Sequence, residues 1–158
     1  MTELFIELLR VSLGLQGELS VAPSKEQWKQ VFMISAKQTL LGVAFSGVEK
    51  LPERQRPPYE ILSKWIASVV RIEQYNKHLN ARVGELAKVC TDHSVKSCLL
   101  KGQGVATLYP NPLRRQAGDI DLWVRGSIDE TLNAFKTISP LDEICHHHAH
   151  CHLFSDTI

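Results

Sequence analysis

A long segment with helical periodicity begins near Tyr59 and limits the folds that this chain can adopt. Its apolar residues recur at steps of three and four, and they are Leu62, Trp65, Ile66, Val69, Ile72, Leu79, Val83 and Leu86. The lysines and arginines of this segment lie largely off that stripe, so the pattern predicts one amphipathic helix. At a rise of ~1.5 Å per residue the helix would be about 45 Å long, enough to support a sheet along one edge.

The chain in front of that helix carries further helix signals. Thr2 can cap an N-terminal helix, and Ser24 with Gln27 forms the capping-box pattern that opens a second one. We expect Gly42 to weaken or end this second helix. Residues 51–58 contain three prolines and form a connector. Residues 1–92 are therefore predicted to be an all-helical region.

The pattern changes after residue 92. Short apolar or alternating runs are separated by glycine, proline and a second capping box that begins at Ser127. They predict a strand, a turn, a short helix, a strand, a helix and a third strand, over residues 95–100, 101–104, 105–109, 119–124, 127–138 and 145–154. Residues 93–158 are therefore predicted to be an α/β region behind the helical one, which makes the chain α+β overall.

Composition and charge exclude several classes of protein. With 44% hydrophobic and 22% charged residues the chain is neither disordered, collagen-like nor membrane-embedded. A net charge of +1 argues against a broad surface for nucleic acid or anionic lipid. Glu7 and Arg10 interrupt the apolar start, so we expect no signal peptide and no membrane span.

The cysteines indicate a reducing compartment. Their spacing is not that of a disulfide framework, and the four residues are Cys90, Cys98, Cys145 and Cys151. We therefore expect reduced thiols and a cytoplasmic protein. Cys90 and Cys98 are expected to be small buried hydrophobic residues.

Two aspartates alternate with apolar residues in the second predicted strand. On a strand, Asp119 and Asp121 would share one face, while Ile120, Leu122 and Val124 would point into a core. Two neighbouring carboxylates repel each other unless a cation lies between them, and hard ions such as Mg²⁺ favour oxygen ligands. The alternative is that the pair belongs to a solvated strand face.

Several segments around this pair resemble a known family. They are Leu99-Leu100-Lys101-Gly102, Leu108-Tyr109-Pro110, Arg114 or Arg115, and Gly118-Asp119-Ile120-Asp121. Together they resemble the uncharacterised nucleotidyltransferase family, part of the DNA-polymerase-beta-like nucleotidyltransferase superfamily. The resemblance is concentrated in residues 99–124 and extends more weakly through the helical front. It implies a helical N-terminal half packed against a small mixed sheet.

The resemblance also implies an activity and a site. Asp119 and Asp121 would be the catalytic ligands of Mg²⁺ or Mn²⁺, and Gly102 and Gly104 would form the nucleotide turn. The protein would move a nucleoside monophosphate from an NTP to an acceptor that the sequence does not identify. Two Mg²⁺ ions about 3.5–4 Å apart suit such an in-line displacement. The cations that can bind phosphate oxygens are Lys101, Arg114 and Arg115, although each can instead be a solvated side chain.

The chain departs from the superfamily pattern in two places. The turn has Gln103 where the superfamily usually has serine, so it lacks a hydroxyl. No obvious strand carries a third acid, and the late candidate Asp156 lies in a turn-like sequence. We therefore expect an N-terminal fragment of a longer protein, with the third acid beyond Ile158.

These departures leave other functions open. A non-catalytic nucleotide-binding or regulatory module of the same fold is the main alternative. A sugar-nucleotide glycosyltransferase also uses a D-x-D metal motif, but the helical region in front of the motif argues against it. Trp123, on the aspartate face, would either stack on a base or pack against the helical front, and the sequence favours packing.

A histidine run follows the last predicted helix. Residues 145–152 contain five histidines and two cysteines, which are good zinc ligands. Ligands in a line along one strand cannot close a tetrahedron, so the sequence favours a half-exposed strand beside the cleft over a metal site.

Overall fold

A computed structural model describes residues 2–136, 143–144 and 149–150 of the 158-residue chain. Its elements are α1 (Thr2–Ser12), α2 (Lys25–Lys37), α3 (Leu41–Lys50), η1 (Glu53–Gln55), α4 (Tyr59–Asp92), β1 (Lys96–Leu100), α5 (Lys101–Ala106), η2 (Pro112–Arg114), β2 (Asp121–Arg125), α6 (Ile128–Lys136), β3 (Glu143–Ile144) and β4 (Ala149–His150). The predicted α+β class is confirmed. Within these described residues β1 pairs with β2 and β3 with β4, both antiparallel.

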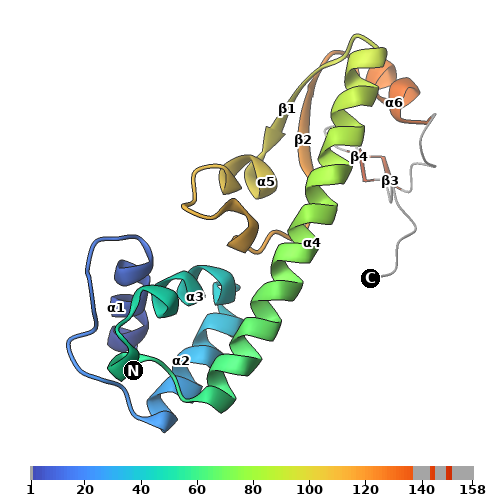
Figure 1. Cartoon of the computed structure of the whole chain (residues 1–158). Coiled ribbons are helices and arrows are strands. Elements are labelled where there is room, and N and C mark those ends of the chain that lie inside the picture. The colour runs from blue at the N-terminus through green and yellow to red at the C-terminus, as the bar shows by residue number, and fades with distance from the viewer. Residues whose placement is uncertain (1, 137–142, 145–148, 151–158) are drawn as a thin grey trace.

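The long helix is confirmed as α4, and it runs the length of the molecule (Figure 1). Its first half packs against α2 and α3 around Trp65, which is 0% exposed. The ring of Trp28 meets Trp65 edge to face at 6.1 Å, and the indole of Trp65 donates a hydrogen bond of 3.0 Å to the carbonyl of Leu41. This packing forms one hydrophobic cluster, called here the first cluster.

The capping boxes form as predicted, whereas the role of Gly42 is different. Ser24 and Gln27 exchange both hydrogen bonds of the box at the start of α2. α2 ends at Lys37, and Gly42 lies inside the next helix. A Cβ at Gly42 would collide with the carbonyl oxygen of Arg114. The missing side chain therefore lets the loop before β2 lie against α3.

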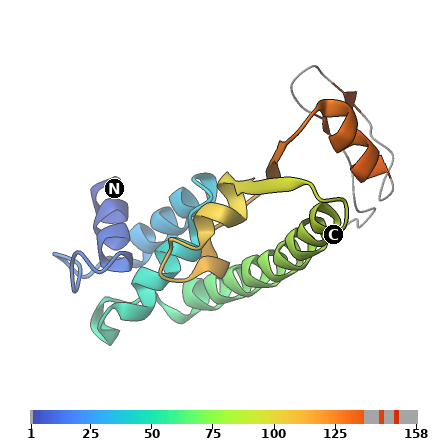
Figure 2. The same ribbon diagram turned by 90° about the horizontal axis from the view of Figure 1, so that it is seen from above.

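The second half of α4 supports the small sheet. Leu86 and Cys90 form a second cluster with Ala134 and Phe135 of α6, and the cluster also contains partly buried Val89, Val95, Ile120, Leu122 and Val124. Figures 1 and 2 show β1 returning alongside this half of the helix, at the end of the molecule far from α1. The predicted inward direction of residues 120, 122 and 124 is confirmed.

Some predicted boundaries and contacts are wrong. β2 begins at Asp121, so Asp119 precedes the strand. α5 begins at Lys101, inside the predicted turn, but the backbone of Lys101 and Gly102 is not helical, so the chain still turns there before the helix continues. Cys98 is exposed, although Cys90 is buried as expected. Most of the histidine run and Asp156 lie outside the described residues. Among the described helices, none is long and apolar enough to cross a membrane.

Candidate functional site

The pairing of β1 with β2 brings the glycine turn to the aspartates. Leu100, the last residue of β1, lies opposite Asp121, the first residue of β2. The turn that follows Leu100 therefore starts beside Asp121, and Lys101 Nζ lies 3.5 Å from Asp121 Oδ2. Both side chains are partly exposed, so this ion pair is worth at most about 1 kcal/mol. The Asp121 carboxylate can thus exchange Lys101 for a stronger cation.

The turn itself needs glycine because backbones approach closely. Gly102 has a φ of +24°, and a Cβ there would lie 3.1 Å from the carbonyl oxygen of Asp119. A Cβ at Gly104 would lie 2.8 Å from the carbonyl oxygen of Leu99. Lys101 has a φ of 40°, which L-residues rarely adopt. Such strained backbone is typical of functional sites.

The two aspartates differ in their setting. Asp121 is half-buried on β2, whereas Asp119 is exposed in the segment before it. Leu122 and Val124 pack toward α4 and α6, so strand alternation turns Asp121 and Trp123 to the opposite face. Trp123 is 52% exposed and is not part of the helical cluster, so the favoured expectation that it packs against the helical front is wrong.

A polar segment of α4 holds the chain that carries these residues. Asn76 is fully buried, and its Nδ2 donates hydrogen bonds of 2.7 Å to the carbonyls of Leu113 and Arg115. The hydroxyl of Tyr75 donates a bond of 3.0 Å to the carbonyl of Gly118, directly before Asp119. α4 therefore positions the approach to β2 through side chains that bond its backbone.

Gln103 anchors the turn to the same part of α4. Its Nε2 donates a bond of 2.8 Å to Asn80 Oδ1 and longer bonds of 3.3 Å to the carbonyl and Oδ1 of Asn76. The side chain is 6% exposed. The residue that departs from the superfamily pattern thus points into the protein and fixes the turn against α4.

Sequence reasoning missed this anchoring set. The signal was present, because Asn76 interrupts the apolar stripe of α4 between Ile72 and Leu79. Asn80, four residues on, lies on the same side of the helix. Buried polar side chains cost free energy unless they are hydrogen-bonded, so a polar residue on an apolar stripe marks a place where another segment is held.

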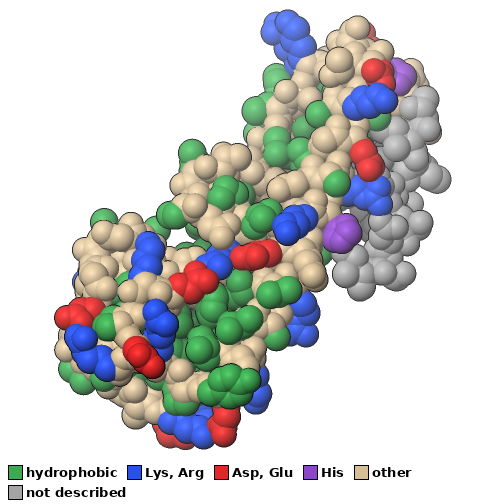
Figure 3. All heavy atoms as spheres, in the orientation of Figure 1, with side chains coloured by type: hydrophobic (Ala, Val, Ile, Leu, Met, Phe, Trp, Pro, Cys, Tyr) green, Lys and Arg blue, Asp and Glu red, His purple; other side chains and the backbone are tan. Residues whose placement is uncertain are grey.

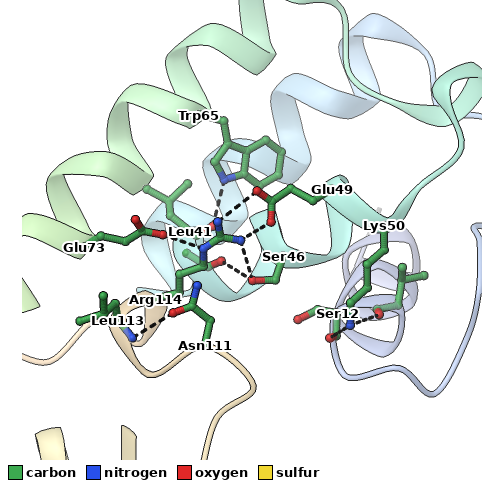
Figure 4. A network of polar contacts seen from close by, with 12 residues as sticks. Ser12, Leu41, Ser46, Glu49, Lys50, Trp65, Glu73, Asn111, Leu113 and Arg114 are labelled. Atoms are coloured by element: carbon green, nitrogen blue, oxygen red, sulfur yellow. Dashed lines mark hydrogen bonds and ion pairs between the residues drawn. The ribbon is translucent and has the colours of Figure 1, made fainter.

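Arg114 is committed to the helical half of the molecule (Figure 4). Its guanidinium bonds both carboxylate oxygens of Glu49, Glu73 Oε1 at 2.8 Å and Ser46 Oγ at 3.0 Å. It also lies 5.4 Å from the ring centre of Phe45. Hydrogen bonds with Glu49 and then Glu73 raise the pKa of Arg114, although burial opposes the shift. Arg114 thus fastens the loop before β2 to α3 and α4.

An apolar groove of about 440 Å³ lies next to this cluster, between α3 and α4. Hydrophobic side chains gather there on the face shown in Figure 3. Ile66 and Val70 contribute exposed apolar surface, while Glu49, Glu73 and Arg114 contribute the charged groups of its lining. The Arg114 cluster is therefore part of the groove wall.

Arg115 differs from its neighbour. Its side chain is half-buried, and within the described part of the chain its Nη1 is buried without a hydrogen-bond partner. A guanidinium nitrogen in that state has unused donor capacity. The two adjacent arginines therefore differ, because Arg114 is engaged on all three guanidinium nitrogens, whereas one buried nitrogen of Arg115 has no partner within the described residues.

The donor set at the aspartates fits a hard divalent cation. Asp119 and Asp121 supply carboxylate oxygens, and Mg²⁺ is commonly held by one or two carboxylates together with substrate phosphates. Over residues 2–136, 143–144 and 149–150, no group of three or more histidine, cysteine or acidic side chains is placed to hold a metal. The two aspartates would leave coordination positions for water and phosphate oxygens.

Comparison with known proteins identifies the family. Residues 24–137 match the family described as uncharacterised nucleotidyltransferase, and this range is more than half of the 158 residues. It contains the anchoring part of α4, the glycine turn and both aspartates. Searches among curated proteins and solved structures gave no match. The chain therefore belongs to the uncharacterised nucleotidyltransferase family.

Proposed function

We propose that this nucleotidyltransferase moves a nucleoside monophosphate from an NTP to an acceptor, with Asp119 and Asp121 binding Mg²⁺ or Mn²⁺. One observation carries the proposal, namely the meeting of two motifs that are 17 residues apart. The Cβ position of Gly102 lies 3.1 Å from the carbonyl oxygen of Asp119, and Lys101 reaches Asp121. A phosphate-sized ligand at this turn would lie beside the Asp121 carboxylate and the backbone of Asp119.

The transfer requires positioning and charge stabilisation more than covalent chemistry by the protein. An acceptor oxygen forms a bond to the α-phosphorus while the bond to the bridging oxygen breaks. Pyrophosphate leaves with the electron pair, and the acceptor proton passes to solvent. A bound divalent metal would neutralise charge on the phosphates and lower the pKa of the acceptor hydroxyl.

The residues of the chain would then have distinct tasks. Lys101 and Arg115 would bind phosphate oxygens, and Gly102 and Gly104 would give the turn the close-packed shape that places Lys101 beside Asp121. Arg114, engaged with Glu49 and Glu73, would position the loop and not contact phosphate. Three further expectations stay predictions: that the cysteine thiols are reduced, that the protein is cytoplasmic, and that the chain divides into regions 1–92 and 93–158.

A non-catalytic nucleotide-binding module is the second candidate. It is favoured by the carboxylate count, because no third acidic side chain joins Asp119 and Asp121 within the described residues. Such a module would bind an NTP with metal but would not release pyrophosphate.

Both candidate functions require metal-dependent binding of an NTP. Calorimetric titration with Mg²⁺ and each NTP tests this binding. We expect wild type to bind an NTP only with metal, and Asp119→Ala and Asp121→Asn to weaken binding by about tenfold or more, equivalent to ~1.4 kcal/mol. Asp92→Asn, which removes an exposed carboxylate at the end of α4, is the matched control and should bind like wild type.

Pyrophosphate release separates the two candidates. Metal-dependent release that Asp121→Asn abolishes would establish transfer, whereas tight binding without release would favour the non-catalytic module. Equal binding by wild type and both aspartate variants would overturn the metal site.

A further inference from the structure

Among the described residues, one face of the β1–β2 sheet is left exposed. The other face packs on α4 and α6 through Leu122 and Val124. In the antiparallel register Cys98 lies opposite Trp123 and Leu100 lies opposite Asp121, so these four residues share the open face. Trp123 is 52% exposed and Leu100 is 42% exposed.

We propose that Trp123 is the platform on which the base of the bound NTP stacks, an inference that rests on the proposed function. Asp121 and Trp123 are two residues apart on one strand face, which is a separation of ~6.5 Å. The open face of the sheet, called here the strip, therefore has a charged end at Asp121 and Lys101 and an aromatic end at Trp123. A nucleotide has the same order, with phosphates at one end and a flat base at the other.

The exposure of Trp123 is unusual within this protein. The other two tryptophans, Trp28 and Trp65, are 1% and 0% exposed in the helical cluster. A large aromatic side chain left half exposed beside a charged group is typical of a binding surface, because it offers apolar area at low entropic cost. Base stacking on such a ring tolerates different bases but is stronger for the larger purine rings.

The rim of the strip adds positive charge. Lys96 and Arg125 are paired across the two strands, and both are exposed on the same face as Trp123. They supply hydrogen-bond donors only. Purines and pyrimidines both carry acceptor atoms on their edges, so these cations would hold either kind of base beside Trp123. The larger stacking area is the reason that we expect purine NTPs to bind more tightly than pyrimidine NTPs.

The fluorescence of Trp123 reports stacking directly, since Trp28 and Trp65 are buried. With Mg²⁺ present, we expect ATP and GTP to quench the exposed component of wild-type emission, and Trp123→Phe to remove this quenching. In calorimetry Trp123→Phe should keep the Kd within about threefold. Trp123→Ala and Trp123→Leu should raise the Kd for purine NTPs roughly tenfold to hundredfold. Tyr59→Ala, which removes another exposed aromatic ring from the far end of α4, should change nothing.

Inorganic tripolyphosphate separates this inference from the proposed function. We expect tripolyphosphate to bind wild type and Trp123→Ala equally, and Asp121→Asn weakly. If tripolyphosphate binds but Trp123→Ala and Trp123→Leu leave the Kd of ATP and GTP unchanged, the platform is overturned and the proposed function stands. If neither tripolyphosphate nor any NTP binds wild type, the proposed function fails and the platform fails with it. Circular dichroism melts establish that each variant is folded.

Discussion

Arg114 connects three elements through one guanidinium. Its side chain is 14% exposed, whereas that of Glu73 is 27% exposed and that of Glu49 is 48% exposed, so water screens the pair with Glu73 less than the pair with Glu49. Arg114→Met keeps most of the volume but leaves two carboxylates unpaired. We expect the free energy of unfolding to fall by about 1–3 kcal/mol in urea titrations.

Arg54→Met is the matched control for that loss. Arg54 pairs with Glu18, and both side chains are more than half exposed. An exposed pair contributes ~0–1 kcal/mol, so the control should lose far less stability. Equal losses in the two variants would show that the Arg114 cluster does not hold the loop.

Glu7 makes stability depend on pH. The backbone N–H of Ser20 and then its hydroxyl donate to this carboxylate, and they hold the pKa of Glu7 below its usual 4.5. A lowered pKa in the folded state means that the stabilisation is present above pH 4.5 and is lost as the pH falls through the folded value. We expect the urea midpoint of wild type to exceed that of Glu7→Gln at pH 7, with the difference disappearing in acid.

The control for this titration is Glu3→Gln, which removes one negative charge from α1 without touching Ser20. A difference between wild type and Glu7→Gln that stays constant from pH 7 to acid would contradict the role of the Ser20 bonds.

The sequence alone could not show that Arg114 and Arg115 have different roles. Both were predicted to be phosphate ligands because they are adjacent cations near the aspartates. Arg114 is committed by Glu49 and Glu73, which are 65 and 41 positions away. Contacts over such distances in the chain leave no local pattern. Cys98 was misjudged for a related reason, since its exposure depends on which sheet face α4 covers.

Glycines in two helices have opposite consequences for the elements that contain them. Gly42 in α3 touches the backbone of Arg114, so Gly42→Ala forces the loop away from the helix. We expect a loss of about 1–3 kcal/mol in the free energy of unfolding, as in other overpacked sites. This result would run against helix propensity, which favours alanine.

Gly84 in α4 is the matched control, because a Cβ there would meet nothing within 4 Å. Gly84→Ala should raise the free energy of unfolding by about 0.5–1 kcal/mol. Stabilisation by both substitutions in urea titrations would mean that α3 and the loop do not pack closely.

The elements that depend on short-range patterns were predicted well. The periodicity of α4 and the capping boxes at Ser24 and Ser127 involve residues within a few positions of each other, and all three formed. The starts of α5 and β2 were misplaced because they depend on where Lys101 meets Asp121. The spacing of the D-x-D pair predicts a metal site, and this stays a prediction. The bonds by which Asn76 and Gln103 hold the neighbouring segments against α4 could be seen only in the tertiary structure.

The part of the chain that the structure describes contains two hydrophobic clusters joined by one helix. The first surrounds Trp65 and the second surrounds Leu86, with the buried polar Asn76 between them along α4. We expect the two clusters to unfold partly independently. In a Trp123→Phe background the tryptophan emission reports only the first cluster, whereas far-UV circular dichroism reports all helices.

Leu86→Ala tests this independence. It should remove about 2–4 kcal/mol from the second cluster and shift part of the circular dichroism transition, while the tryptophan midpoint stays in place. Val31→Ala in the first cluster should shift the tryptophan midpoint. An equal shift of both signals by Leu86→Ala would mean that the chain unfolds as one cooperative unit.

The continuity of α4 also limits how the length of this chain can change during evolution. One residue gained or lost between Asn76 and Leu86 would turn everything beyond it by ~100°. The stripe that meets α6 would then face water, while the stripe that meets α3 stayed in register. Insertions and deletions should therefore accumulate in the connection between α1 and α2. The 34-residue helix α4 should tolerate them only in multiples of about seven residues, because two full turns restore the direction of the side chains beyond the change.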